Sequence, residues 1–218
     1  MRQLFKVIGL CLLWSGFACA DIKVQVIDAE GKPVENAVVS VPRPESASQP
    51  NASTIDTAVM DQVDKQFLPH VLLVKAGQPV VFPNSDQVRH HVYSFSKPND
   101  FEIRLYSGTQ VEPVSFNHPG VVVLGCNIHD QMVGYLYVQE NEVAQVSDTK
   151  GYVSFKDDVL MNAADNQVIT IWHSQLSNNK TERVTRLLSD KNAEGEWVVT
   201  VNLIPEVKKT SRKFKLRY

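Results

Sequence analysis

The sequence is poor in cysteine and lacks several motifs that indicate a particular chemistry. It has three cysteines in 218 residues, and none belongs to a C-x-x-C-H motif, which excludes a c-type haem. The G-x-S-x-G, H-E-x-x-H and phosphate-binding-loop patterns are also absent, so the commonest signatures of serine hydrolases, zinc peptidases and nucleotide-binding enzymes are missing. We therefore expect a protein that is not an enzyme.

Long hydrophobic runs are also lacking, and the one at the N-terminus is too short to cross a bilayer. Arg2 and Lys6 precede an apolar run over Val7–Trp14, and residues 18–20 have the sequence A-C-A. A membrane helix needs about 20 apolar residues, whereas this shorter pattern is typical of a secretory signal. We predict that residues 1–20 are a signal peptide, cleaved after Ala20, and that the protein is periplasmic. No second run is long enough to span a membrane.

Cleavage would remove Cys11 and Cys19 and leave Cys126 as the single cysteine. An alternative makes Cys19 the lipidated first residue of a lipoprotein, but Gly16 stands where such signals usually have an aliphatic residue. A single cysteine in an exported protein cannot form an internal disulfide. The Cys126 thiol is then buried and inert, free and reactive, or bound to a metal.

An excess of positive charge is lacking as well. The formal net charge is −2, and loss of Arg2 and Lys6 makes it −4, so nothing indicates binding to nucleic acid. The exception is a basic tail, residues 205–218, which we interpret as a solvated charge run. Local positive charge can also steer an acidic redox partner or an anionic lipid surface.

Helical periodicity is missing, and short apolar or alternating runs bounded by Gly, Pro, Asn and Asp take its place. Such runs are typical of β-sandwiches and barrels. We therefore predict an all-β protein. The predicted strands are Ile22–Ile27, Ala37–Val41, His70–Val74, Pro79–Phe82, Val92–Phe95, Val121–Leu124, Gly134–Val138, Tyr152–Phe155, Val168–Trp172 and Trp197–Leu203.

The segment that begins at Cys126 carries three kinds of metal-binding side chain. Its sequence is C-N-I-H-D-Q-M, so a thiolate, the imidazole of His129 and the thioether of Met132 lie within seven residues. Sulfur ligands with imidazole favour copper, and two His, one Cys and a weak axial Met form blue-copper electron-transfer sites. The second imidazole must come from elsewhere. The candidates are His70, His90, His91, His118 and His173.

The surroundings of His90 and His91 differ from those of the other candidates. An apolar strand ends at Phe82, a polar loop follows, and the next strand begins with the His pair. Because neighbouring residues of a strand point to opposite faces, only one of the pair can face a metal. The remaining candidates have no ligand-like neighbours, and we interpret them as structural.

This arrangement resembles the cupredoxins, the family of plastocyanin, pseudoazurin and amicyanin, in which a strand-starting His is followed by Asn. The resemblance puts the ligand at His90. It covers roughly residues 60–139, and the two-residue gaps from Cys126 to His129 and from His129 to Met132 match amicyanin. The same span looks like periplasmic plastocyanin-like proteins described as methylamine-utilization proteins.

The resemblance implies a Greek-key β-sandwich with one copper ion, which cycles between Cu(I) and Cu(II) and is bound by His90, Cys126, His129 and Met132. It implies that both imidazoles bind through the ring nitrogen nearer the backbone. It also implies that His129, with Met132 and Val133 beside it, forms the surface on which redox partners dock.

Two positions depart from the family pattern. Ile128 stands where cupredoxin loops often have Pro, and His91 replaces the Asn that commonly ties the two ligand loops together. Groups around the ligands tune their orientation and the reduction potential of the metal. We therefore expect these changes to affect the potential rather than copper binding itself.

The sequence around this region resembles a second kind of domain. Residues 21–41 look like the opening two strands of a carboxypeptidase regulatory-like or transthyretin-like sandwich, and residues 147–155 look like its next strand. We predict a sandwich formed by residues 21–45 and 146–204, a linker over 46–58, and a cupredoxin domain over 59–140 that is inserted in it. The alternatives are a simple tandem of domains and one enlarged sandwich.

The predicted function is that of a one-electron carrier with a mononuclear type 1 copper site. Its partners would be redox proteins of the periplasm, which the sequence does not identify. The sequence predicts no particular oligomeric state. One alternative is a copper storage or delivery protein that uses the same ligands. Another is an interaction module that binds no metal and contacts protein or glycan through its sandwich.

Overall fold

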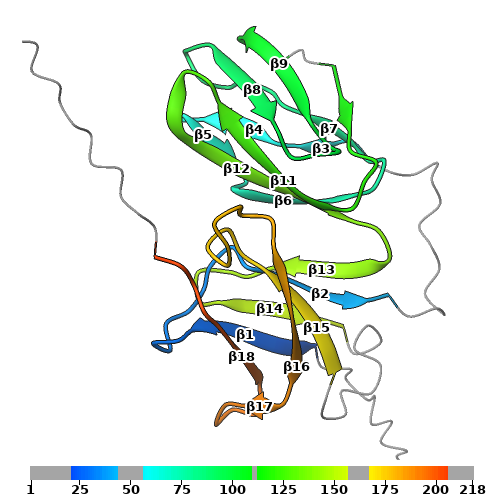
Figure 1. The fold of residues 1–218 in the computed structure, drawn as a ribbon, viewed down its shortest axis with the longest axis vertical. Helices are drawn as coiled ribbons and strands as arrows, with labels where there is room; N and C mark the ends of the chain where they lie inside the picture. The colour runs from blue at the N-terminus through cyan, green and yellow to red at the C-terminus, as the bar shows by residue number, and fades with distance from the viewer. Residues whose placement is uncertain (1–20, 44–55, 110–111, 157–166, 206–218) are drawn as a thin grey trace, which may run out of the picture.

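A computed structural model of the chain describes residues 21–43, 56–109, 112–156 and 167–205 (Figure 1). These residues form strands joined by turns and loops, and none of them forms a helix. The predicted all-β class is therefore confirmed. A helix long and apolar enough to cross a membrane is accordingly not found within these ranges. The predicted signal peptide, residues 46–55 of the predicted linker and residues 206–218 of the predicted basic tail lie outside the described residues.

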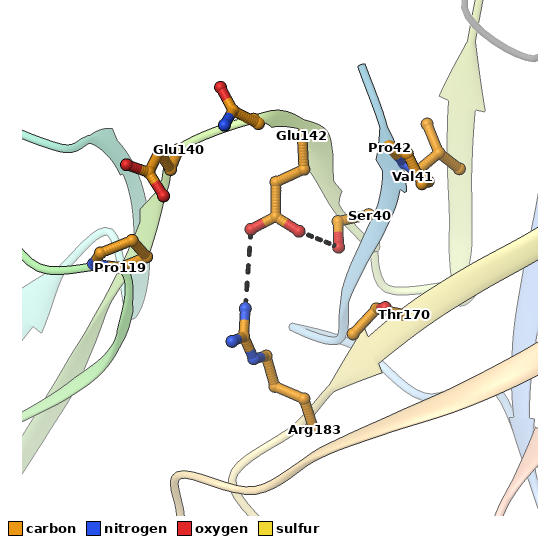
Figure 2. A pocket seen from close by; sticks show the side chains of 9 residues that line it. Ser40, Val41, Pro42, Pro119, Glu140, Glu142, Thr170 and Arg183 are labelled. Carbon is orange, nitrogen blue, oxygen red and sulfur yellow. Dashed lines mark hydrogen bonds and ion pairs between the residues drawn. The ribbon is translucent and has the colours of Figure 1, made fainter. Parts of the chain in front are cut away.

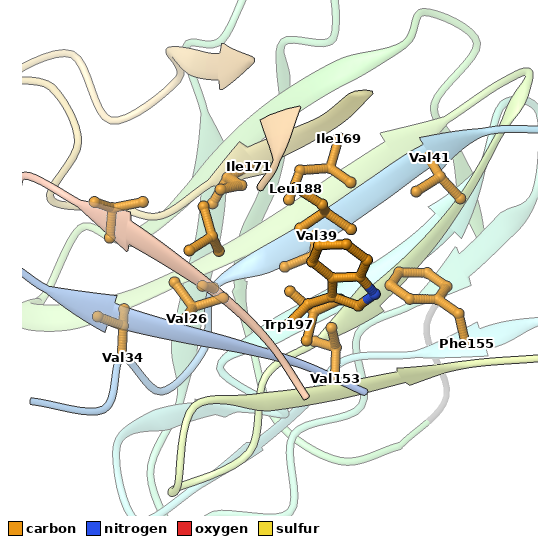
Figure 3. Packing of buried hydrophobic residues seen from close by; sticks show 14 residues of the cluster. Val26, Val34, Val39, Val41, Val153, Phe155, Ile169, Ile171, Leu188 and Trp197 are labelled. Carbon is orange, nitrogen blue, oxygen red and sulfur yellow. The ribbon is translucent and has the colours of Figure 1, made fainter. Parts of the chain in front are cut away.

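Two four-stranded sheets form a first sandwich, in the lower half of Figure 1. One sheet has the order β14-β1-β18-β17, with the bounds Tyr152–Phe155, Ile22–Asp28, Trp197–Val201 and Asp190–Lys191. The other has the order β13-β2-β15-β16, with the bounds Glu142–Val146, Val38–Pro42, Gln167–Trp172 and Arg183–Leu188. Their facing sides share a core of valine, isoleucine and aromatic side chains around Trp197 (Figure 3).

The remaining strands form a second sandwich. Its larger sheet has the order β6-β12-β11-β8-β9, with the bounds Val71–Lys75, His129–Gln139, Gly120–Cys126, His90–Ser94 and Phe101–Tyr106. A smaller sheet has the order β10-β7-β3, with the bounds Val114–Ser115, Pro79–Val81 and Ala58–Val59. The hairpin of β4 and β5, Asp61–Val63 and Gln66–Leu68, completes it. A separate hydrophobic core, which includes Phe67, Phe82 and Leu136, lies between these parts.

The two sandwiches meet through strands that are buried on both faces. In β12, Leu136 and Val138 belong to the core of the second sandwich, whereas Tyr135 and Tyr137 belong to a third cluster at the junction. Trp172 of β15 packs in this cluster, with its ring centroid 5.0 Å from that of Tyr135. Because alternate residues of a strand point to opposite faces, a continuous apolar run such as that of β12 can serve two cores at once.

The first sandwich is built from strands that flank the second one in the sequence. β1 pairs with β14 and β18, and β2 pairs with β13 and β15, whereas β3 to β12 lie between β2 and β13 along the chain. Two predicted boundaries differ from the structure. Ala58, assigned to the linker, lies in β3 and pairs with Val80 of β7. The first sandwich resumes at Glu142, where β13 begins, and not at residue 146.

The strand patterns miss several strands, notably β9 and β13. β9 lies at the edge of its sheet, and its exposed positions include Glu102 and Arg104. Charged side chains are common on edge strands because they discourage pairing with other chains. They also break up the apolar alternation by which a strand is recognised.

Candidate metal site

Cys126 and His129 face each other across a tight hairpin. β11 ends at Cys126 and β12 begins at His129, so Asn127 and Ile128 form the whole turn. Cys126 is the antiparallel partner of His129, and directly opposite residues of such a pair project from the same face of the sheet. The two-residue gap thus brings the thiol and the imidazole together, with Cys126 Sγ 3.6 Å from His129 Nδ1.

His90 reaches the same face from the neighbouring strand β8. Val92 lies opposite Cys126 in the pairing of β8 with β11, and residues two apart on a strand share a face. His90 is therefore on the side of Cys126, and its Nδ1 atom lies 3.7 Å from Cys126 Sγ. His91 lies on the opposite face, where its Nε2 atom is 3.0 Å from Glu102 Oε1.

The three candidate ligand atoms form a compact triangle. His90 Nδ1 and His129 Nδ1 lie 3.2 Å apart. Cys126 Sγ lies 3.7 Å from the first nitrogen and 3.6 Å from the second. The point equidistant from the three atoms is about 2.0 Å from each, close to the bond lengths of about 2.0–2.3 Å that imidazole nitrogen and thiolate sulfur make to a transition metal such as zinc. Within the described ranges, no other group of His, Cys, Asp and Glu side chains is arranged to hold a metal. Two His and one Cys are the trigonal donor set of blue-copper sites, so the residues fit copper.

The site is enclosed on one side and open on the other. His90 is 0% exposed and Cys126 is 3% exposed, whereas His129 is partly exposed. Met132 is 1% exposed and packs in the same hydrophobic cluster as Cys126. The expectation that Met132 helps to form a docking surface is therefore wrong, because a buried side chain cannot meet a partner. The exposed apolar neighbour of His129 is instead Ile128, at 52%.

The second ring nitrogen of His90 contacts a carboxylate that the sequence patterns did not single out. His90 Nε2 lies 2.6 Å from Asp86 Oδ2. Burial alone would raise the pKa of the Asp86 carboxyl, but hydrogen bonds from the Lys65 N–H, His90 and the Asp64 N–H together lower this pKa below its ordinary value. Asp86 is therefore an anion beside the imidazole.

Asn84 stabilises the loop that leads to His90. Its Nδ2 atom donates to the carbonyl oxygens of Val88 at 2.9 Å and Tyr106 at 3.0 Å, and its Oδ1 atom accepts from the N–H of Asp86 at 3.0 Å. Asn and Asp side chains commonly bond to the backbone of nearby residues in loops. The signal that could have identified Asn84 and Asp86 is their occurrence together in the polar loop before His90.

Tyr106, the strand partner of His90, lies beside the site. Its hydroxyl donates to the carbonyl oxygen of Phe82 at 2.5 Å and also contacts Gln62 Nε2. Burial raises the pKa of Tyr106 to about 12, although the hydrogen bond from Gln62 acts in the opposite direction. The phenol therefore stays neutral and packs against the hydrophobic cluster that contains Cys126.

The other histidines do not join the site. The ring of His70 makes an edge contact with Tyr135 at 5.2 Å between centroids, and His173 Nδ1 accepts from the Gln175 N–H at 3.2 Å. The backbone N–H of His118 donates to Asn99 Oδ1 at 3.3 Å. These contacts agree with a structural interpretation of the three residues.

A pocket of about 290 Å³ lies beside the junction of the two sandwiches (Figure 2). Glu142 on its wall accepts a hydrogen bond from Ser40 at 2.7 Å and pairs with Arg183 at 3.7 Å. Arg183 also donates to the Tyr137 hydroxyl at 3.3 Å. Because these polar groups satisfy one another, we interpret the pocket as part of the junction.

No family model and no curated protein sequence matches the chain. Among solved structures, the chain is similar to a reduced amicyanin variant, at 20% identity over 46% of this chain and 98% of that chain, with a TM-score of 0.36. It is similar to a reduced Cu(I) form of another amicyanin variant, at 20% identity over 48% of this chain and 100% of that chain, with a TM-score of 0.36. It is also similar to a Cu-containing nitrite reductase from Thermus scotoductus SA-01, at 25% identity over 45% of this chain and 25% of that chain, with a TM-score of 0.37.

Proposed function

We propose that the protein is a cupredoxin-like copper protein that carries single electrons in the periplasm. In this proposal His90, Cys126, His129 and Met132 bind one copper ion. The observation that carries it is the triangle of two imidazole nitrogens and one thiol sulfur, whose sides of 3.2, 3.6 and 3.7 Å suit a single metal at its centre. We also propose that a copper domain, which begins at residue 58 and ends at residue 140, is inserted in the sandwich that β1, β2 and β13 to β18 form.

Each ligand has a distinct part in this proposal. Bound copper would supply a one-electron couple between Cu(I) and Cu(II). Cys126 would contribute a thiolate, and the hydrophobic cluster around it excludes water. Met132, in the same cluster, would be the weak axial ligand. His129 is the partly exposed member of the triangle, and its ring would connect the site to a redox partner.

Burial of the site supports a carrier over a copper delivery protein. His90 and Cys126 lie on adjacent strands of one sheet and are almost inaccessible to solvent. Ligands fixed by strands and packing hold one geometry in both oxidation states, which suits electron transfer. Delivery would require a partner to replace buried ligands, and most of the site would have to open first.

The test is addition of Cu(II) to the chain without residues 1–20, followed by visible and electron spin resonance spectra. We expect one copper per chain and an intense visible absorption from the bond between thiolate and copper. Cys126→Ser is expected to lose this absorption while it keeps the fold. The proposal is wrong if the unmodified chain and Cys126→Ser give the same weak bands.

Two further measurements separate the alternatives. Voltammetry should give a reversible one-electron wave, and a Cu(I) chelator such as bicinchoninic acid should remove copper slowly. Rapid loss to the chelator without a reversible wave would favour copper storage or delivery. Failure to take up copper at all would favour the interaction module that binds no metal.

A further inference from the structure

A carboxylate contacts the nitrogen of His90 that faces away from Cys126. Asp86 Oδ2 lies 2.6 Å from His90 Nε2, while His90 Nδ1 lies 3.7 Å from Cys126 Sγ. A neutral imidazole has one N–H donor and one lone pair. When Nε2 carries the proton and donates it to Asp86, the lone pair is on Nδ1, the nitrogen that belongs to the ligand triangle.

Asp86 is itself fixed by two backbone donors from the β4–β5 hairpin. The N–H of Asp64 donates to Oδ1 at 2.6 Å, and the N–H of Lys65 donates to Oδ2 at 2.9 Å. Asp64 and Lys65 form the two-residue turn of this hairpin, with φ angles of 52° and 60°. Positive φ at both positions is typical of type I′ hairpins. Both oxygens of Asp86 are engaged, so the carboxylate cannot turn away from His90 without losing hydrogen bonds.

The same hairpin is packed on β12, the strand that carries His129. Phe67 of β5 is 1% exposed, and a Cβ atom on Gly134 of β12 would lie 2.6 Å from the Cβ atom of Phe67. The backbones of the hairpin and β12 are therefore in close contact. This packing positions Asp86 relative to both segments that supply an imidazole to the triangle.

His91 provides an internal comparison. Its Nε2 atom also lies near a carboxylate, Glu102, at 3.0 Å, but the Glu102 side chain is 50% exposed and that of Asp86 is 11% exposed. His91 lies on the face of β8 away from Cys126. Each of the two adjacent histidines therefore lies near a carboxylate, but only His90 is hydrogen-bonded to it, and only His90 belongs to the ligand triangle.

We propose that Asp86 is a positioning residue that fixes the Nε2–H tautomer of His90 and strengthens His90 as a ligand for Cu(II). This inference rests on the copper site proposed above. A carboxylate bonded to a ligating imidazole makes the ring a better donor, and loss of such a partner typically lowers metal affinity about 10- to 100-fold. Because a stronger donor favours Cu(II) over Cu(I), loss of Asp86 raises the reduction potential.

The copper-bound experiment compares Asp86→Asn with Glu102→Gln. Each substitution removes one negative charge beside a histidine and keeps the shape of the side chain. We expect Asp86→Asn to lower Cu(II) affinity at least tenfold in competition titrations, whereas Glu102→Gln leaves it unchanged. The reduction potential depends on the ratio of the Cu(II) affinity to the Cu(I) affinity. It should rise by about 59 mV for each tenfold decrease in this ratio. Equal affinities and potentials for the two variants would overturn the proposal.

A second experiment needs no copper. In the metal-free protein, ¹⁵N NMR of the imidazole rings should report the Nε2–H tautomer for His90, and Asp86→Ala should produce a mixture of tautomers. Circular dichroism checks that Asp86→Ala is folded, and Asp86→Asn takes its place if it is not. An Nδ1–H tautomer in the unmodified protein would overturn the role of Asp86. If His90 has the Nε2–H tautomer but the protein takes up no copper, the proposed function is refuted, and the role of Asp86 in fixing the tautomer is not.

Discussion

His90 and His129 are 39 positions apart in the sequence, yet their Nδ1 atoms lie 3.2 Å from each other. His129 reaches this point through the two-residue turn after Cys126, and His90 reaches it as the first residue of β8. Two imidazole lone pairs at this distance repel each other unless a proton or a cation lies between them. The arrangement is therefore one that a bound metal ion stabilises.

The opposite directions of His90 and His91 make a prediction about copper binding. His90→Ala removes one corner of the triangle, so we expect it to abolish the intense absorption that Cu(II) gives with the unmodified chain. His91→Ala removes a ring that contacts Glu102 on the other face, and it should leave the absorption in place. Copper titrations followed by visible spectra check both variants. The opposite result would show that His91 is the ligand.

Met132 is predicted to affect the reduction potential of the copper-loaded protein but not to be needed for its intense visible absorption. Met132→Leu conserves the volume of a buried side chain, so its cost in folding free energy should be below about 1.5 kcal/mol. It removes the thioether that we propose as the axial ligand. Because the axial ligand of a blue-copper site tunes the potential, we expect a changed potential with the absorption retained. Voltammetry of the copper-loaded protein measures the change.

Met60 supplies the control for this experiment. It is 0% exposed and packs in the same hydrophobic cluster as Met132, so Met60→Leu makes the same change of volume in the same core. We expect its potential to equal that of the unmodified chain. Equal potentials for both variants would remove Met132 from the ligand set.

The placement of the Cys126 loop was predictable because its spacing matches a simple backbone geometry. A gap of two residues is what a tight hairpin requires, and in such a hairpin the flanking residues, Cys126 and His129, face each other. The alternation of side chains between the faces of a strand allowed only one of His90 and His91 to face a metal. The choice of His90 came from the resemblance to the cupredoxins, so local sequence was sufficient only for the Cys126 loop.

The contacts of Asp86 could not be predicted in this way. Asp86 lies in an irregular loop, so no periodicity relates it to His90, and its other donors are backbone N–H groups of residues 64 and 65. Every residue except proline has a backbone N–H, so the sequence does not show which residues use it to bind a carboxylate. The burial of Met132 was missed for a related reason, because it depends on the packing of segments that are distant in the sequence.

Tyr106 is predicted to weaken the fold at high pH. The pKa of a tyrosine is about 10 in an unfolded chain, and burial raises that of Tyr106 to about 12 in the folded protein. Between these values the folded state keeps a proton that the unfolded state releases. The free energy of unfolding should therefore fall as the pH rises from about 10 to 12, by at most about 1.4 kcal/mol per pH unit, and Tyr106 adds no slope below pH 10.

Urea unfolding of the metal-free protein at a series of pH values tests this prediction. Tyr106→Phe loses the hydrogen bond to the Phe82 carbonyl, so it should be less stable at neutral pH, but its stability should decline less steeply above pH 10. If the decline is as steep in Tyr106→Phe as in the unmodified chain, another group is responsible for it.

Gly134 and Gly125 should respond differently to the addition of one methyl group. A Cβ atom on Gly134 would lie 2.6 Å from Phe67 Cβ, whereas one on Gly125 would lie 2.9 Å from the Cζ and Oη atoms of Tyr93. The Cβ atom of Phe67 is attached directly to the backbone of β5, so no rotation of the side chain can move it. The far end of the Tyr93 ring can move, because this side chain is only partly buried.

We therefore expect Gly134→Ala to lower the free energy of unfolding by about 1–3 kcal/mol, the usual range for overpacking, and Gly125→Ala to lower it by less. Urea unfolding of the metal-free variants measures both values. Because Gly134→Ala must displace the hairpin that supplies the N–H donors to Asp86, it should also increase the rate at which a chelator removes copper. A large loss of stability with an unchanged rate of copper loss would mean that the hairpin packs on β12 without positioning His90.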